Sequence, residues 1–434
     1  MYDQVMERIK NQDPETSMLA LRALSWIHHA VRPLNAAELC HALAVEPGDK
    51  VFDDEGVPES ALVTAVCAGL VTLQGSGTFA LVHYTAEEYL KRRPRSLFPD
   101  IKLELAQNCL TYVSLDDFGE GPSLGDEQLD KRLTLYPFYS YAASFWGCHV
   151  RGDAEAQLQS TIVEFISQEM KTMSSIQALQ TTKSRYPKWS QEFTKLVTGL
   201  WVAINFELPI VCAFLMSQGA DLEAKDSSGQ RLLHRAAIQG CTDIMDMLLE
   251  RQVDLDATSN DYKRTALHWA SVHGHYKIAK ALLARHAQVD ARDKGKRTVL
   301  SLAASNGDES LVRLLLDAGA DIDARDAYGG TPLYRAAESG NHAATRILLD
   351  AGANINAASI FNQTALHRAA DVGHLAVTVC LLEKGANVNL KDEYGWTPFY
   401  RASDNGHGEV ATLLLEHVQQ PKELAKPLIS LEVG

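Results

Sequence analysis

A repeat with a period of 33 residues fills the second half of this 434-residue chain. Its marker residue, Thr in six of seven copies, recurs at intervals of 33, 34, 33, 33, 33 and 33 residues. The seven markers are Thr198, Arg231, Thr265, Thr298, Thr331, Thr364 and Thr397. Because one copy of this length is too short to bury its own apolar face, the copies must stack on one another to form a continuous core.

Fixed positions within each copy predict two helices joined by a turn. Five residues beyond the marker, all seven copies have an alanine, which is small enough to let neighbouring helices pack closely: Ala203, Ala236, Ala270, Ala303, Ala336, Ala369 and Ala402. Nine residues beyond the marker, six copies have glycine and the first has Glu207. Glycine there suits a left-handed backbone at the end of the first helix. A second apolar helix follows in each copy.

This period and three segments, Thr331-Pro-Leu-Tyr334, Thr265-Ala-Leu-His268 and Thr364-Ala-Leu-His367, resemble ankyrin repeats. The resemblance implies a mainly α-helical solenoid of about seven repeats, with hairpin tips on one side, that binds other proteins. We expect this array over residues 194–418, followed by a C-terminal tail, 419–434.

The resemblance places the residue three before each marker at a hairpin tip. Four copies have an aromatic residue there, Tyr262, Tyr328, Phe361 and Tyr394, and Trp396 stands one residue before the last marker. Large, rigid side chains at accessible positions are typical binding anchors. We interpret these five residues as candidates for binding a protein partner. The alternative is that each ring lies on the neighbouring tip and only stiffens the row.

The residue four beyond the marker is expected on the concave side of the first helices. Five copies have Arg235, Trp269, Arg335, Arg368 and Arg401 there. A row of arginines would suit an acidic partner. In the alternative, Arg335, Arg368 and Arg401 pair with Glu338, Asp371 and Asp404, each three residues on. No acidic residue stands three positions after Arg235 or Trp269, so these two are the stronger candidates.

Neither a metal nor a cofactor is expected. His268 and His275 occupy positions that other copies also fill with histidine, so repeat architecture explains them. The seven cysteines form no C-x-x-C pair, which favours a reducing compartment. A basic run, which lies between the third and fourth copies, either contacts an anion or is only a solvated surface. It comprises Arg285, Arg292, Lys294, Lys296 and Arg297.

The N-terminal half has the pattern of a winged helix. Helices are expected at 17–29, 35–44 and 59–70, and a hairpin at 71–83. Asn35 and Glu38 form a capping-box pattern at the second helix.

Several phrases, such as Leu24-Ser-Trp-Ile27 and Leu81-Val-His-Tyr-Thr-Ala-Glu-Glu-Tyr89, resemble the winged helix of fungal NACHT-ankyrin proteins, which are STAND NTPases of the NLR-like kind. The segment 136–149 resembles the helices that precede their ankyrin arrays. The resemblance implies a winged-helix domain at 1–95 and a helical linker or capping domain at 96–193. The NTPase module and its phosphate loop, expected upstream in that family, are absent, so no nucleotide is expected to bind this chain.

The first copy suggests why helices precede the array. Trp201, Phe206 and Phe214 stand where an uncovered terminal repeat would need a polar face. We therefore expect the preceding helices, among them 154–170 and 174–181, to dock on this copy.

Charge disfavours nucleic acid and membranes as main partners. Lys and Arg total 41 against 55 Asp and Glu, a net charge of -14. We expect a non-catalytic, cytoplasmic interaction protein with an unidentified protein partner. One alternative is a DNA-associated regulator that uses the winged helix, although Lys50 is the only cation between Asn35 and Leu70. Another is an enzyme with an unrecognised site in the helical region, where Asp116, Asp117 and Glu120 would be the acid–base candidates.

Overall fold

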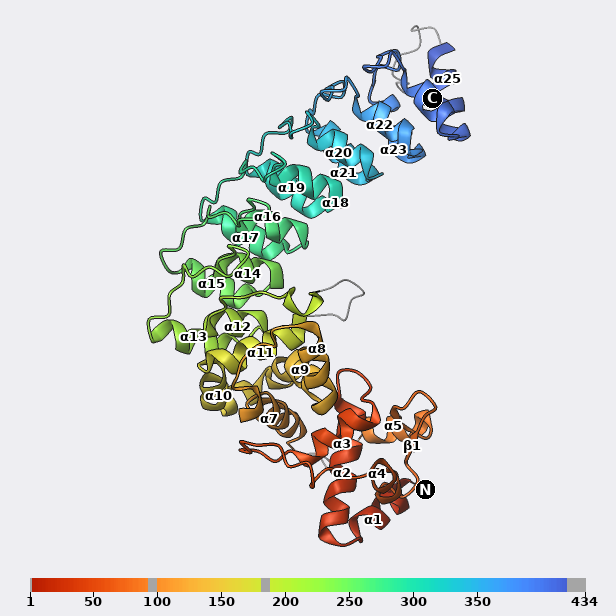
Figure 1. Ribbon diagram of the computed structural model, residues 1–434. Helices are drawn as coiled ribbons and strands as arrows, with labels where there is room; N and C mark the ends of the chain where they lie inside the picture. Colours follow the sequence, from red (N-terminus) through yellow and green to blue (C-terminus); the bar gives the residue numbers. More distant parts are fainter. Residues whose placement is uncertain (1, 93–99, 181–187, 420–434) are drawn as a thin grey trace, which may run out of the picture. The chain divides into compact units, whose positions relative to one another are not determined.

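The computed structural model describes residues 2–92, 100–180 and 188–419 (Figure 1). The chain forms two compact units, Met1–Ser227 and Ser228–Gly434, and most residue–residue contacts lie within one unit or the other. The expected tail, 419–434, lies outside the described residues except for Gln419, which ends a helix, and the expected domain boundary at 95 also lies outside them. Within them the chain is mainly helical, as predicted.

Five helices and a hairpin form the first part of the N-terminal unit. They are α1 (Tyr2–Lys10), α2 (Pro14–His29), α3 (Ala36–Ala44), α4 (Ser60–Val66), β1 (Val71–Leu73), β2 (Phe79–Leu81) and α5 (Tyr84–Arg92). The predicted hairpin is confirmed, with Val71 opposite Leu81. So is the capping box of Asn35 and Glu38. Helix α1 was not predicted, and α4 ends before the predicted residue 70 because Ala68 and Gly69 have positive φ.

A helical segment follows and shares its core with α2. Its elements are α7 (Ile101–Val113), η1 (Asp116–Phe118), α8 (Asp126–Leu135), α9 (Tyr139–Val150), α10 (Asp153–Ile166), α11 (Glu169–Gln180) and η2 (Trp189–Gln191). Trp26 of α2 is fully buried, with its ring centroid 5.2 Å from Phe138 and 5.9 Å from Tyr141. These edge-to-face contacts join the two segments.

The first helix pair, α12 (Gly199–Asn205) and α13 (Pro209–Ser217), packs on this helical segment. The Trp146 and Phe206 ring centroids lie 4.4 Å apart, and the Arg151 Nε donates a 3.0 Å hydrogen bond to the Phe206 carbonyl. A Glu155 carboxylate oxygen accepts the Val211 N–H at 2.9 Å. Trp201 and Phe206 are buried, whereas Phe214, also expected to be covered, is 37% exposed. The N-terminal unit therefore extends into the repeats.

The C-terminal unit contains six further helix pairs. The first helices are α14 (Leu232–Gln239), α16 (Ala266–Val272), α18 (Val299–Asn306), α20 (Pro332–Glu338), α22 (Ala365–Val372) and α24 (Pro398–Asp404). The second helices are α15 (Thr242–Leu249), α17 (Tyr276–Ala284), α19 (Glu309–Asp317), α21 (His342–Asp350), α23 (Leu375–Glu383) and α25 (Gly408–Gln419). The last five markers are N-caps whose hydroxyls accept an N–H from the first turn.

The predicted left-handed glycines are confirmed, and they also provide space for stacking. Gly340 has a φ of 74°, and a Cβ on it would lie 2.7 Å from the His374 ring of the next copy. The Nε2 of His374 is 3.1 Å from the Glu338 carbonyl oxygen at the end of the preceding first helix. Gly373 and His407 repeat this arrangement one copy later. Each glycine thus allows a side chain of the next copy to reach an unsatisfied helix C-terminus.

Candidate functional site

The hairpin tips of the C-terminal unit form one continuous row. The backbone N–H groups of Lys294, Ala327, Ile360 and Glu393 donate to the carbonyls of Tyr262, Gly295, Tyr328 and Phe361 at 2.7, 2.9, 3.0 and 3.0 Å. Each bond joins one tip to the next. The row therefore holds its side chains at fixed spacing without any bound partner.

All four aromatic residues predicted at the tips project into solvent. Tyr262 is 53% exposed, Tyr328 60%, Phe361 39% and Tyr394 66%. The Tyr262 and Tyr394 rings contact Trp269 and Trp396 of their own copies, at 6.2 and 5.9 Å. Each of these two rings thus has an aromatic contact within its own copy, and more than half of each residue remains exposed.

Two exposed residues beside this row were missed from the sequence. Ile360 is 60% exposed next to Phe361, and Tyr400 is 48% exposed with its ring centroid 4.7 Å from Trp396. Neither occupies the position three before a marker, where aromatic side chains recur. For Ile360 the available signal was an apolar residue at a tip position that other copies fill with a polar or small residue. Tyr400 lies in α24, three residues after its marker, where other copies also have large side chains, so its position gave no such signal.

The three C-terminal arginines of the predicted concave row are held in a chain of ion pairs. The chain runs in the order Asp326, Arg335, Glu338, Arg368, Asp371, Arg401 and Asp392. The pairs expected three residues after Arg335 and Arg368 are present, at 2.6 and 2.7 Å. Arg401 contacts Asp392 at 2.5 Å instead of the expected Asp404. Three cations face four carboxylates, which favours the intramolecular alternative for these arginines.

The buried carboxylates at the tips were also missed. In four copies the residue five before the marker is a buried aspartate: Asp226, Asp293, Asp326 or Asp392. Asp392 accepts the N–H groups of Tyr394 and Trp396 at 2.9 and 3.0 Å. Burial would raise the pKa of Asp392, but these N–H groups and the Arg401 guanidinium hold it below its ordinary value. The recurrence of Asp or Ser at this position was the available signal.

Of the other two predicted residues, Trp269 lies beside Arg264, and Arg235 lies close enough to His273 to affect its pKa. The Arg264 guanidinium lies 4.9 Å from the Trp269 ring centroid and 5.1 Å from that of Tyr262. Burial lowers the pKa of Arg264, and the positive charge of Arg297 lowers it further. Burial, His275, Arg264 and Arg235 together lower the pKa of His273. This region therefore concentrates positive charge beside exposed aromatic rings.

His268 is a structural side chain with a strong pH dependence. It is fully buried, with its Nδ1 2.9 Å from the Thr265 hydroxyl oxygen and its Nε2 3.3 Å from the Arg297 carbonyl oxygen. Burial lowers its pKa to about 4. Below pH 6.5 the unfolded chain binds a proton that the folded chain excludes, so stability present above pH 6.5 is lost as the pH falls toward 4.

We expect this histidine to cost the native state about 2 kcal/mol at pH 5 relative to pH 7.5. Urea unfolding of the full chain and of His268→Asn at both pH values measures it. The wild type should lose about 2 kcal/mol more than the variant between the two pH values. Equal losses would show that His268 titrates normally in the folded state.

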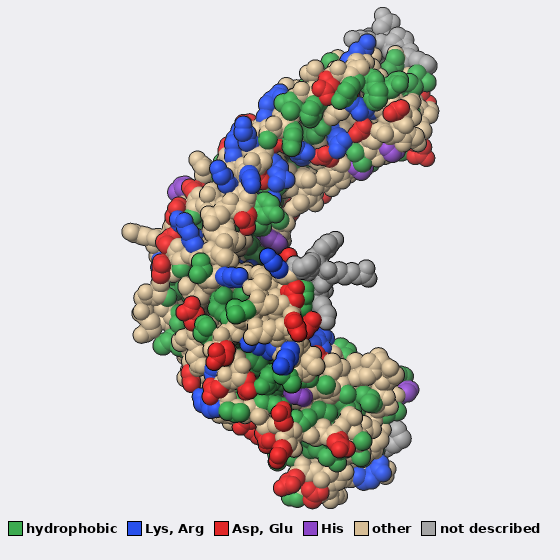
Figure 2. Space-filling model, viewed as in Figure 1, with side chains coloured by type: hydrophobic (Ala, Val, Ile, Leu, Met, Phe, Trp, Pro, Cys, Tyr) green, Lys and Arg blue, Asp and Glu red, His purple; other side chains and the backbone are tan. Residues whose placement is uncertain are grey.

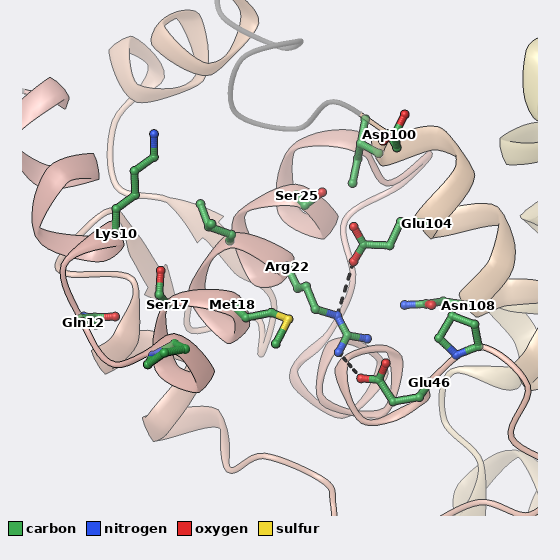
Figure 3. Close-up of a pocket in the computed structure, with 14 residues that line it drawn as sticks. Lys10, Gln12, Ser17, Met18, Arg22, Ser25, Glu46, Asp100, Glu104 and Asn108 are labelled. Atoms are coloured by element: carbon green, nitrogen blue, oxygen red, sulfur yellow. Dashed lines mark hydrogen bonds and ion pairs between the residues drawn. The ribbon is translucent and has the colours of Figure 1, made fainter.

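The N-terminal unit has a pocket of about 760 Å³ between α2 and α7 (Figure 3). Arg22 reaches across it to Glu46 at 2.5 Å and to Glu104 at 3.4 Å. Burial raises the pKa of Glu104, although Arg22 opposes this shift. Since both glutamates lie on the same guanidinium, the pocket's charged groups serve to hold α2, α7 and the loop after α3 together.

Two of the three acid–base candidates of the helical region, Asp116 and Asp117, have structural partners. Asp116 contacts the Lys171 ammonium at 2.7 Å, and this contact holds the pKa of Asp116 below its usual range. Asp117 accepts a 2.6 Å hydrogen bond from the Tyr136 hydroxyl. In the described parts of the chain, no three His, Cys, Asp or Glu side chains converge as metal ligands. No described helix has the length and apolar character needed to cross a bilayer.

Comparisons with known proteins agree with both halves of this architecture. Residues 200–293, 283–359 and 357–424 match the family described as ankyrin repeats (3 copies). Residues 7–104 match the winged helix domain of GPI inositol-deacylase. Over 79 residues, 18% of this chain, the sequence is 37% identical to palmitoyltransferase Hip14 of Drosophila melanogaster. That segment covers 12% of the Drosophila protein, so the likeness is confined to a small part of it.

Proposed function

This chain belongs to the ankyrin-repeat proteins, and on that premise we propose that it is a non-catalytic protein whose array binds a protein partner in the cytoplasm. The observation that carries the proposal is the row of exposed aromatic side chains on hydrogen-bonded hairpin tips. Tyr262, Tyr328, Phe361 and Tyr394 are the anchors we assign to this surface.

Such a row suits protein recognition for two physical reasons. An aromatic side chain buries roughly 150–250 Å² when it is covered, which is a large gain for a single residue. The backbone bonds between tips have already ordered the loops, so binding costs little further conformational entropy. Trp396 and Tyr400 widen the apolar area around Tyr394.

The N-terminal half fits the role of a regulatory and structural module in an NLR-like sensor. Its winged-helix domain shares a core with the helical segment through Trp26, Phe138 and Tyr141. The helical segment in turn packs on the first helix pair through Trp146 and Phe206. In our proposal these contacts cap the array at its first copy and couple the winged helix to it.

The test is a variant in which Tyr262, Tyr328, Phe361 and Tyr394 are all changed to Ala. We expect a partner that co-purifies with the wild-type chain to be lost from the variant, because four exposed anchors are removed. The partner is then identified, and its Kd is measured with purified components. A chain with Tyr276→Ala, a 38% exposed tyrosine on α17, is the control for loss of a surface ring away from the tips.

The four-residue variant must remain folded at the temperature of the binding assay, which thermal unfolding checks, because Phe361 is only 39% exposed and Tyr262 and Tyr394 also contact neighbouring tryptophans. An unchanged partner list, or an unchanged Kd, would show that the tips do not form the recognition surface.

A further inference from the structure

Charge is divided unequally along the row of hairpin tips. Residues 259–264 and 293–297, the tips of the third and fourth copies, contain Lys263, Arg264, Lys294, Lys296 and Arg297 against Asp261 and Asp293, a net charge of +3. The next three tips, 326–330, 359–363 and 392–396, contain no Lys or Arg and have a net charge of -3. When the residue before each tip is included, the net charge is +4 for the first two tips and -1 for the next three, so the difference in charge between the two groups remains.

We propose that the tips of the third and fourth copies bind an acidic segment of the protein partner, while adjoining apolar residues of the same partner lie on the remaining tips. This inference rests on the proposed function and names the chemistry of the partner. Figure 2 shows hydrophobic side chains gathered over the helix pairs nearest the C-terminus of this unit, with Lys and Arg side chains toward its middle copies.

The first support is a shortage of carboxylate at the cationic tips. The Asp293 carboxylate is shared by two guanidinium groups, Arg297 at 2.8 Å and Arg264 at 3.8 Å. The longer distance exceeds that of a hydrogen bond, and the Nε of Arg264 is buried with no hydrogen-bond partner among the described residues. In the last three copies, by contrast, carboxylates outnumber arginines. The Arg297 side chain is 37% exposed, so an external carboxylate could reach it and add negative charge to this pair of guanidinium groups.

The second support is the backbone at two of these lysines. Lys263 and Lys296 have φ values of 51° and 58°, in the left-handed region that glycine adopts with least strain. Gly329 and Gly395 occupy the equivalent position two before the marker in later copies, with φ of 74° and 78°. The chain therefore keeps two cations at positions where glycine would be less strained. Leu196 and Asn362 occupy the same position in other copies without a charge, so the feature particular to these two tips is the lysine side chain.

The same charge pattern favours a short acidic peptide over a nucleic acid. A polyanion longer than two tips would extend over tips whose net charge is negative, and it would meet Tyr328, Ile360 and Phe361 rather than cations. A segment with a few carboxylates and then apolar side chains matches both parts of the row.

The experiment measures fluorescence anisotropy with the full chain and labelled synthetic peptides. One peptide has four glutamates followed by Leu-Ile-Phe, and a second has the same residues in reverse order. Each has a control peptide in which lysine replaces every glutamate. We expect one glutamate peptide to bind at least tenfold more tightly than its lysine counterpart, with affinity falling as salt rises. The double variant Lys263→Gly and Lys296→Gly should bind it about tenfold more weakly while its Tm stays the same or rises.

Asn362→Gly is the matched control, because Asn362 has a φ of 55° at the same tip position and carries no charge. It should leave peptide affinity unchanged. The proposal is overturned if neither glutamate peptide binds, if the lysine-to-glycine variant binds equally well, or if a single-stranded DNA oligonucleotide of equal length binds as tightly.

If the natural partner depends on the aromatic tips but not on these lysines, the proposed function stands and this inference fails. If no partner depends on the tips, the proposed function fails whatever the peptides show.

Discussion

Gly147→Val should lower the free energy of unfolding of the N-terminal unit by about 3 kcal/mol. Gly147 lies inside α9, and a Cβ built on it would lie 2.3 Å from a ring carbon of Phe206. Phe206 is buried against Trp146, so its ring must move to make room. Helix propensity alone gives the opposite sign, because glycine is the weakest helix former after proline. Chemical denaturation followed by tryptophan fluorescence measures the change.

Three further variants test the cause. Gly147→Ala should destabilise less than valine because it adds only one carbon. Phe206→Leu should partly restore stability when combined with Gly147→Val, since the smaller side chain relieves the overlap. Gly408→Ala, at the start of α25 with open space around it, should be neutral or slightly stabilising. A stabilised Gly147→Ala protein would mean that α9 and the first helix pair do not pack closely.

The repeat made the second half of the fold predictable, because residues that recur at a fixed spacing show directly which helices stack on one another. Alanine and glycine recur where helices approach each other, so the helix pairs and left-handed turns followed from position alone. In the N-terminal half, the capping box at Asn35 and the hairpin before Phe79 were equally local signals. The sequence predicted that helices before the array would cover Phe206, but it did not predict Gly147 as the contact, since the two residues are far apart in sequence and Gly147 lies outside the repeat.

The candidate site was predictable to the same extent. Recurrence at the tips identified Tyr262 and Tyr394, because these rings lie where the repeat must expose them. The pairing of Arg401 was predicted wrongly because helix spacing favours Asp404, whereas the hairpin places buried Asp392 closer. Which of two carboxylates an arginine pairs with, one on its own helix or one on a neighbouring hairpin, depends on how deeply each carboxylate is buried. A sequence pattern does not show that burial.

Asp326→Ala should lower the free energy of unfolding of the C-terminal unit by about 3–4 kcal/mol. The side chain of Asp326 is 1% exposed, accepts the N–H groups of Tyr328 and Gly330 at 2.8 and 3.0 Å, and pairs with Arg335. Alanine would remove the turn's two acceptors and leave a largely buried guanidinium with Glu338 alone. Urea unfolding, with hydrogen exchange of α20 and its neighbours, measures the loss.

Asp326→Ser separates these two contributions. Ser359 occupies the same position in the next copy, where its hydroxyl accepts the Phe361 and Gln363 N–H groups at 3.2 and 3.3 Å. Serine at 326 should therefore keep the turn and lose only the Arg335 pair, giving a loss smaller than that of alanine. Asp404→Ala, the same change at an exposed aspartate, should stay within about 0.5 kcal/mol of wild type. If Asp326→Ser were as destabilising as Asp326→Ala, the ion pair would account for the whole effect, and the turn would need no side-chain acceptor.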